Sequence, residues 1–145
     1  MKYTLTIDID LPRQKVIELF DDPDNLKHWQ EGFISLEPVS GKPGEIGAKS
    51  RLQYRMGKRE IEMIETITSR NLPLEFSGAY EAPGVWNEVR NFFEEIDGNR
   101  TRWRSEVEFR FQSFFMKMMG FLMPGAFRKQ SFKYMSDFKK FAEGR

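Results

Sequence analysis

The residues best placed for chemistry lie within segments that otherwise alternate like β-strands. Glu65 interrupts the apolar series Ile61, Met63 and Ile67 in "REIEMIETIT". A carboxyl group buried in such a series would have a raised pKa and could act as an acid or a base. A β-bulge that turns Glu65 outward explains the pattern equally well. Glu65 is therefore a candidate catalytic residue, with that alternative open.

Two asparagines form a second candidate group. In "VWNEVRNFFEEI" the less charged face carries Asn87 and Asn91 between apolar residues. A buried amide without a partner costs about 1–3 kcal/mol, so each would need a neighbouring strand, a trapped water or a ligand. Tyr54, Tyr80 and Ser105 could bring hydroxyl groups to the same space, and an apolar wall with few polar points is typical of small-molecule pockets. These groups could equally form hydrogen bonds with one another, or the face of the strand taken here as inward could be the outward one.

The remaining chemistry is limited by composition. The chain has no cysteine and one histidine, which excludes disulfides, thiol nucleophiles and multi-histidine metal sites. His28 lies in "LKHWQ", where we expect a surface or capping histidine rather than a catalytic one, and Trp29 beside it is expected to be a packing anchor. Neither a Gly-rich phosphate loop nor metal-ligand spacing is present. We expect no metal and no cofactor.

Charge and length indicate the class of protein. The 145 residues suit a single domain over 1–145, and the net charge of +1 argues against a nucleic-acid partner. The N-terminal "MKYTLTIDID" alternates and lacks the apolar core of a signal peptide, so a cytoplasmic protein is expected. No apolar run is long enough to span a bilayer. A basic cluster on the final helix could favour transient contact with an acidic membrane surface: Arg128, Lys129, Lys133, Lys139 and Lys140.

The elements that position these residues follow from periodicity. "KYTLTIDID" predicts a half-buried strand, and two short helices should follow it, the first capped by Asp10 and the second opened near Pro23. From Phe33 to Gln112 the period is close to two, which predicts six consecutive antiparallel strands. The segment 113–143 predicts a long helix, kinked or split at Pro124. This order indicates an α+β fold, in which the final helix covers the apolar face of a curved sheet.

The order of elements resembles the helix-grip fold of the START-like, or SRPBCC, superfamily. Three stretches carry the resemblance: "IDIDLPRQKVIELFDDPDNLKHWQEG", "FFEEIDGNRTRWRSEVEF" and "MMGFLMPGAFRKQSFKYMSDFKKFAEG". They are most similar to the polyketide cyclase/dehydrase and lipid-transport branch. The resemblance implies a curved antiparallel sheet wrapped around a long C-terminal helix, with an apolar cavity between them that binds lipids, polyketides or other hydrophobic molecules.

The inward faces give a predicted cavity wall. It comprises Leu52, Tyr54, Met63, Phe76, Tyr80, Asn87, Val89, Asn91, Trp103, Ser105, Val107, Phe109, Met116, Met119, Phe121 and Met123. The last four lie in "FFMKMMGFLMPGAF", whose flexible methionines suit a repacking wall or mouth, with Pro124 as a hinge, although an ordinary kinked core helix also fits.

Three functions follow from these observations. The first is binding of a hydrophobic small molecule. The alternatives are a cyclase/dehydratase-type enzyme that uses Glu65, Asn87 or Asn91, and a protein-interaction module that uses the Phe/Met segment as its partner-facing surface. The oligomeric state is not predicted.

Overall fold

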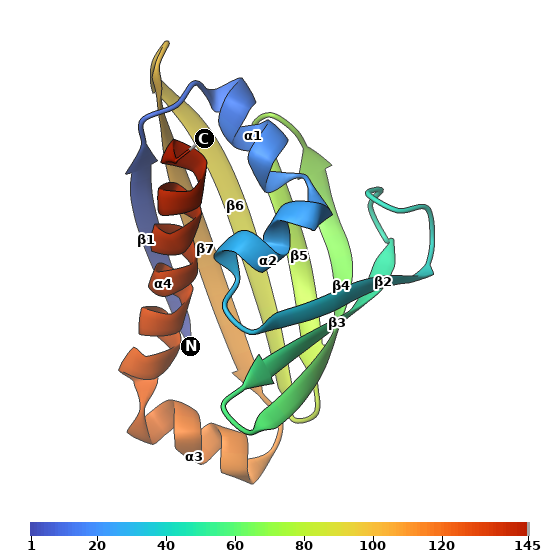
Figure 1. Ribbon diagram of the computed structural model, residues 1–145. Helices are drawn as coiled ribbons and strands as arrows, with labels where there is room; N and C mark the ends of the chain where they lie inside the picture. Colours follow the sequence, from blue (N-terminus) through green and yellow to red (C-terminus); the bar gives the residue numbers. More distant parts are fainter. Residues whose placement is uncertain (145) are drawn as a thin grey trace.

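Seven antiparallel strands form one curved sheet in the order β1-β7-β6-β5-β4-β3-β2 (Figure 1). The computed structural model describes residues 1–144. The strands are β1 Lys2–Ile9, β2 Phe33–Ser40, β3 Lys49–Met56, β4 Arg59–Asn71, β5 Glu75–Ala82, β6 Val85–Asp97 and β7 Arg100–Phe111. The helices are α1 Arg13–Phe20, the 3-10 helix η1 Pro23–Asn25, α2 Leu26–Trp29, α3 Phe114–Leu122 and α4 Pro124–Glu143. The predicted α+β architecture is confirmed.

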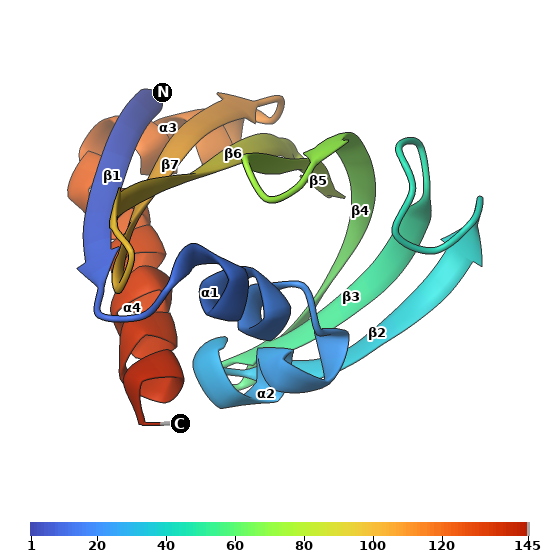
Figure 2. The same cartoon turned by 90° about the horizontal axis from the view of Figure 1, so that it is seen from above.

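Helices α1, α2 and α4 lie on the concave face of the sheet, whereas α3 lies at its lower end (Figure 1). Seen from above, α1 and α2 occupy the mouth of the curve, and α4 runs beside β1 and β7 (Figure 2). The first strand pairs with the last, so that Leu5 lies opposite Ser105. Polar residues alternate with the apolar ones along β1, and its buried residues are Leu5 and Ile9. The strand period of two thus directs one apolar set toward the helices.

An aromatic cluster fills the upper part of the concave face. Its centre is Phe20 of α1, whose ring centroid lies 5.0 Å from that of Phe93 and 5.5 Å from that of Trp103. Trp29 of α2 and Phe138 of α4 complete the cluster, with ring centroids 5.2 Å apart. Phe138 is fully buried, and Trp29 is the packing anchor that its position predicted. This end of the fold is therefore closed by side chains.

The start of α1 differs from the expectation. Asp10 does not cap this helix; the N-cap position is Pro12, and no side chain caps it. The backbone N–H of Asp10 instead donates to Glu143 of α4, because the chain passes the end of that helix before it turns. The second helical segment does begin near Pro23, where the Asp22 carboxylate accepts from the N–H of Asp24 at 2.9 Å.

The C-terminal helix is split, as the Pro-Gly pair predicted. Helix α3 ends at Leu122 and α4 begins at Pro124, whose missing N–H is tolerated in a first turn. The helical spacing of Phe132, Met135 and Phe138 predicts one buried stripe on α4; Met135 and Phe138 are buried, but Phe132 is 45% exposed. The face that meets the sheet passes through Ser131 instead, whose hydroxyl lies 2.7 Å from that of Tyr3. Strand alternation would also place Met56 and Leu74 inward, but both are exposed: Met56 is the last residue of β3, and Leu74 lies in the turn before β5.

Candidate functional site

One row of register partners crosses the concave face below the aromatic cluster. Ser50 of β3 lies opposite Glu65 of β4, Glu65 opposite Tyr80 of β5, and Tyr80 opposite Asn87 of β6. We call these four residues the polar row; Phe109 of β7 continues it as the partner of Asn87. Side chains that are paired across neighbouring strands share a face, so the row lies on the side that carries the helices. The bulge in β4 falls between Ile67 and Ser69, after Glu65, and does not turn Glu65 outward.

Glu65 and Tyr80 form the ionisable centre of the row. Burial raises the pKa of the Glu65 carboxyl group, and a hydrogen bond from the Tyr80 hydroxyl opposes part of that rise. Burial raises the pKa of Tyr80 well above its ordinary value, and the nearby charge of Glu65 adds to the effect. A carboxyl group with a raised pKa keeps its proton to higher pH and can exchange it with a bound molecule. The raised pKa expected for an inward Glu65 is found.

Tyr54 reaches the same region from β3. Its hydroxyl donates to Oε1 of Gln30 at 2.7 Å. Burial raises the pKa of Tyr54, and the neighbouring Tyr134 of α4 and Glu65 raise it further. Sequence reasoning missed both Gln30 and Tyr134. Tyr134 could have been found, because it lies seven residues after Phe127 and four before Phe138 on one helical stripe; Gln30 lies in the irregular segment after α2 and has no such signal.

The two candidate asparagines differ in what they bind. Oδ1 of Asn91 accepts a hydrogen bond from Nε1 of Trp103 at 2.9 Å, inside the buried core. Oδ1 of Asn87 is buried and has no hydrogen-bond partner among the residues that the structure describes. Buried acceptors are satisfied in the great majority of cases. Asn91 therefore supports the fold, whereas Asn87 presents an unused acceptor beside Tyr80.

The strand residues of the predicted cavity wall share the concave face but fall into two groups. The buried group is Leu52, Tyr54, Asn91, Trp103, Ser105 and Val107. The half-buried group is Met63, Phe76, Tyr80, Asn87, Val89 and Phe109, together with Glu65. Several belong to packed clusters: Phe76 contacts Phe20, and the ring of Phe109 lies 5.0 Å from that of Phe127 on α4. The residues of the polar row are therefore half-buried: they lie on the concave face, but neighbouring side chains do not cover them completely.

The predicted wall residues of α3 are not brought to the polar row. Phe121 of α3 is 80% exposed, and Met123, between α3 and α4, is 49% exposed. Met116 and Met119 are half-buried. The position of Met116 is close to the β5–β6 turn, since a Cβ added to Gly84 would lie 3.4 Å from its Cγ. His28 is exposed, and its ring stacks on that of Phe141 with the centroids 5.1 Å apart, as a surface histidine would.

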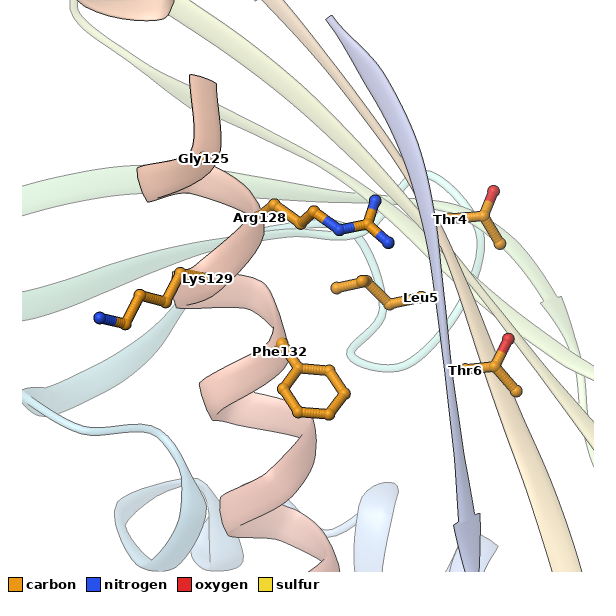
Figure 3. A pocket seen from close by; sticks show the side chains of 7 residues that line it. All are labelled: Thr4, Leu5, Thr6, Gly125, Arg128, Lys129 and Phe132. Carbon is orange, nitrogen blue, oxygen red and sulfur yellow. The ribbon is translucent and has the colours of Figure 1, made fainter. Parts of the chain in front are cut away.

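Two open grooves lie where the C-terminal helices meet the sheet, apart from the polar row. The first, of about 380 Å³, runs between β1 and α4 and is lined by Thr4, Leu5, Thr6, Gly125, Arg128, Lys129 and Phe132 (Figure 3). The second, of about 450 Å³, lies between β7 and α3 and is lined by Met1, Phe109, Arg110, Phe111, Lys117, Gly120 and Phe121. In the first groove Arg128 points toward β1, while Lys129 points away from it (Figure 3). Neither groove contains the polar row.

A family model described as "Polyketide cyclase / dehydrase and lipid transport" matches residues 1–142. No curated protein matches the chain. Solved structures match it closely in shape, and their folds are the helix-grip arrangement that the sequence predicted.

A conserved protein from Geobacillus kaustophilus has a TM-score of 0.81 at 15% identity, with 98% of this chain and 95% of that chain covered. The Zhui aromatase/cyclase from Streptomyces sp. R1128 has a TM-score of 0.82 at 12% identity, with coverage of 99% and 93%. The di-domain aromatase/cyclase StfQ from the steffimycin biosynthetic pathway has a TM-score of 0.72 at 14% identity, with 99% of this chain and 44% of that chain covered.

Proposed function

Because the chain belongs to the polyketide cyclase/dehydrase and lipid transport family, we propose that it binds a hydrophobic small molecule over the polar row, between the sheet and α4. The observation that carries the proposal is Oδ1 of Asn87, a buried acceptor without a partner among the described residues. It lies next to the pair formed by Glu65 and Tyr80, on a face that also carries apolar residues such as Met63, Val89 and Phe109. An apolar surface with a few convergent polar groups is the usual form of a small-molecule site.

The polar row favours a ligand that carries a hydroxyl group. A hydroxyl hydrogen can donate to Oδ1 of Asn87, while the carboxyl of Glu65 can accept from or donate to a second polar group of the ligand. The apolar part of the ligand would rest on Val89 and Met63, with about 25 cal/mol gained per Å² removed from water. Orientation would thus come from the row and affinity from apolar burial.

A matched pair of probes tests this proposal. 2-Naphthol and naphthalene differ by one hydroxyl group, and titration calorimetry should give the tighter dissociation constant for 2-naphthol by about tenfold, the value of one good hydrogen bond. The variant Asn87→Leu should bind the two probes equally. The control Glu81→Gln, on the exposed side of β5, should retain the discrimination.

The proposal fails on either of two results. The first is that neither probe binds and native mass spectrometry of the purified protein detects no hydrophobic adduct. The second is that Asn87→Leu keeps the same preference for 2-naphthol, which would place the site elsewhere.

The Glu65–Tyr80 pair also supports a second function, acid-base catalysis of dehydration. A protonated Glu65 could give its proton to the hydroxyl of a bound β-hydroxyketone, which then leaves as water while a base removes the proton next to the carbonyl. The product is a conjugated enone with a new ultraviolet absorbance. An aromatic β-hydroxyketone should be dehydrated by the wild type and not by Glu65→Gln, and an equal rate for the two proteins would eliminate this function.

A further inference from the structure

Helix α3 exposes large apolar side chains to solvent. Phe114, Phe115 and Phe121 are 78%, 67% and 80% exposed. We call the exposed set the α3 apolar surface; it comprises Phe114, Phe115, Met118, Phe121, Leu122 and Met123. A contiguous apolar patch of this kind on a globular domain marks a contact site rather than ordinary surface variation.

The opposite side of α3 attaches the helix to the domain. Gly120 is buried, and a Cβ added there would lie 2.5 Å from a ring carbon of Phe111 on β7. The hydroxyl of Ser113 caps the helix by accepting from the N–H of Met116 at 3.1 Å. Because small and capping residues form the attachment, the phenylalanines are left facing outward and contribute little to the packing of the core.

Positive charge surrounds the α3 apolar surface. The sequence from Phe109 to Ser136 contains no aspartate or glutamate and five cationic residues: Arg110, Lys117, Arg128, Lys129 and Lys133. Arg110 pairs with Glu108, and Lys133 pairs with Asp137 and Glu31. Within residues 1–144, Lys117, Arg128 and Lys129 form no ion pair, and all three are exposed. These three unpaired cations lie in α3 and the first turns of α4, and no acidic residue between Phe109 and Ser136 offsets them.

The first groove adds a place for an anionic headgroup. It begins at Gly125, near the junction of α3 and α4, and the guanidinium of Arg128 points across it toward β1, whose Thr4 and Thr6 side chains lie on the other side of that strand (Figure 3). An exposed guanidinium without an ion-pair partner among the described residues suits a phosphate oxygen. The groove and the α3 apolar surface therefore offer a headgroup contact and an apolar contact on adjoining elements.

We propose that α3 and the start of α4 dock on the surface of an anionic lipid bilayer. The phenylalanines would enter the boundary between headgroups and acyl chains, and Lys117, Arg128 and Lys129 would contact the headgroups. A second copy of the chain fits less well, because it would bring like charges together. No helix of the described residues is long and apolar enough to span a bilayer, and α3 with nine residues is about 13 Å long, so the contact is interfacial.

Vesicle flotation tests the docking surface. The full chain should float with vesicles that contain roughly one third phosphatidylglycerol in phosphatidylcholine, and binding should weaken as salt is raised from about 0.05 to 0.5 M. The double variant Phe115→Ser/Phe121→Ser should bind at least tenfold more weakly. Its matched control is Ile46→Ser, which removes a 65% exposed apolar side chain from the β2–β3 loop and should have no effect.

A second matched pair of variants tests how positive charge contributes to vesicle binding. Lys117→Glu should weaken binding to the anionic vesicles by about fivefold or more, whereas Lys58→Glu, an equal change of charge at the β3–β4 turn, should leave it nearly unchanged. Circular dichroism checks that each variant is folded. Asn87→Leu should bind vesicles normally, so failure of the docking proposal is distinguishable from failure of ligand binding on the concave face.

Three results would overturn the docking proposal. One is the absence of flotation with anionic vesicles. Another is flotation that the phenylalanine variants leave unchanged. The third is a mass in solution of two chains that Phe115→Ser/Phe121→Ser reduces to one, which would make a second copy the occupant of this surface.

Discussion

The hydroxyl group of Tyr80 donates a hydrogen bond to the carboxyl group of Glu65, its register partner on the neighbouring strand. The contact turns two residues of a β-ladder into one proton-sharing unit on the concave face. It also holds an ionisable group in the interior, at a position where an apolar residue would give a more stable fold. The first prediction follows from that arrangement.

Glu65→Gln should stabilise the protein at neutral pH. Burial raises the pKa of Glu65 in the folded protein above its unfolded value, and the Tyr80 hydrogen bond offsets only part of that rise. The unfolded chain therefore loses this proton first as pH increases, so the free energy of unfolding falls between the unfolded and the folded pKa. The variant should gain about 1 kcal/mol near pH 7, or roughly 3–4 °C in Tm.

A Tm profile against pH checks the assignment. The gain of Glu65→Gln should vanish below about pH 4, where the carboxyl is protonated in both states. Glu81→Gln, which alters an exposed carboxylate on β5, should follow the wild-type profile. A gain of the same size at every pH would mean that the charge of Glu65 is not its cause.

Asn87→Leu and Asn91→Leu should change stability in opposite directions. Asn87→Leu removes an unpaired buried acceptor and should raise the free energy of unfolding by about 1 kcal/mol. Asn91→Leu leaves Nε1 of Trp103 without its acceptor and should lower it by about 1–3 kcal/mol. Urea unfolding followed by tryptophan fluorescence measures both, and equal changes for the two variants would contradict the assigned roles.

Gly120→Ala should loosen α3. The added Cβ would lie 2.5 Å from Phe111, so either the ring or the helix must move, at about 1–3 kcal/mol. Gly125→Ala is the matched control in the first turn of α4, where an added Cβ meets nothing within 4 Å and should be neutral or slightly stabilising. Amide hydrogen exchange across 114–122 should increase only in the first variant.

Phe138→Ala should be strongly destabilising. Phe138 is fully buried and contacts the rings of Phe20, Trp29 and Trp103, so its loss leaves a cavity worth about 3–5 kcal/mol. Phe132→Ala, on the same helix but 45% exposed, should change the free energy of unfolding by less than about 1 kcal/mol. Thermal unfolding of the two variants therefore tests which side of α4 faces the sheet.

Alternation made the sheet predictable. A one-residue change of register moves a whole apolar set to the other face, so the clean alternation of "TRWRSEVEFRFQ" determined both the strand and its inward residues. The same argument gave the inward positions of Asn87 and Asn91. It could not separate their roles, because those depend on Trp103 of the neighbouring strand and not on the sequence around each asparagine.

Other features lay beyond the local pattern. The local pattern leaves the orientation of Glu65 open, because it does not locate the bulge in β4, which falls after Ile67. The sequence of α4 contains aromatic residues on more than one side of the helix, so it does not determine which side faces the sheet. The contact of Tyr3 with Ser131 shows that the side through Ser131 does so. The apolar residues of α3 looked like a wall of the interior, but Gly120 is its point of attachment and leaves the phenylalanines outside.

The pairing of the first strand with the last has a consequence for biosynthesis. The terminal ammonium group of Met1 donates to the carbonyl of Phe109, 108 residues further along the chain. At about 5–20 residues per second, a ribosome would synthesise β1 roughly 5–20 s before β7 leaves it. During that interval the apolar face of β1 has no sheet to join, and the alternating polar residues Lys2, Thr4, Thr6 and Asp8 keep it from pairing with other nascent chains. The closing step of folding, in which β1 pairs with β7, is therefore expected to wait until β7 has been synthesised.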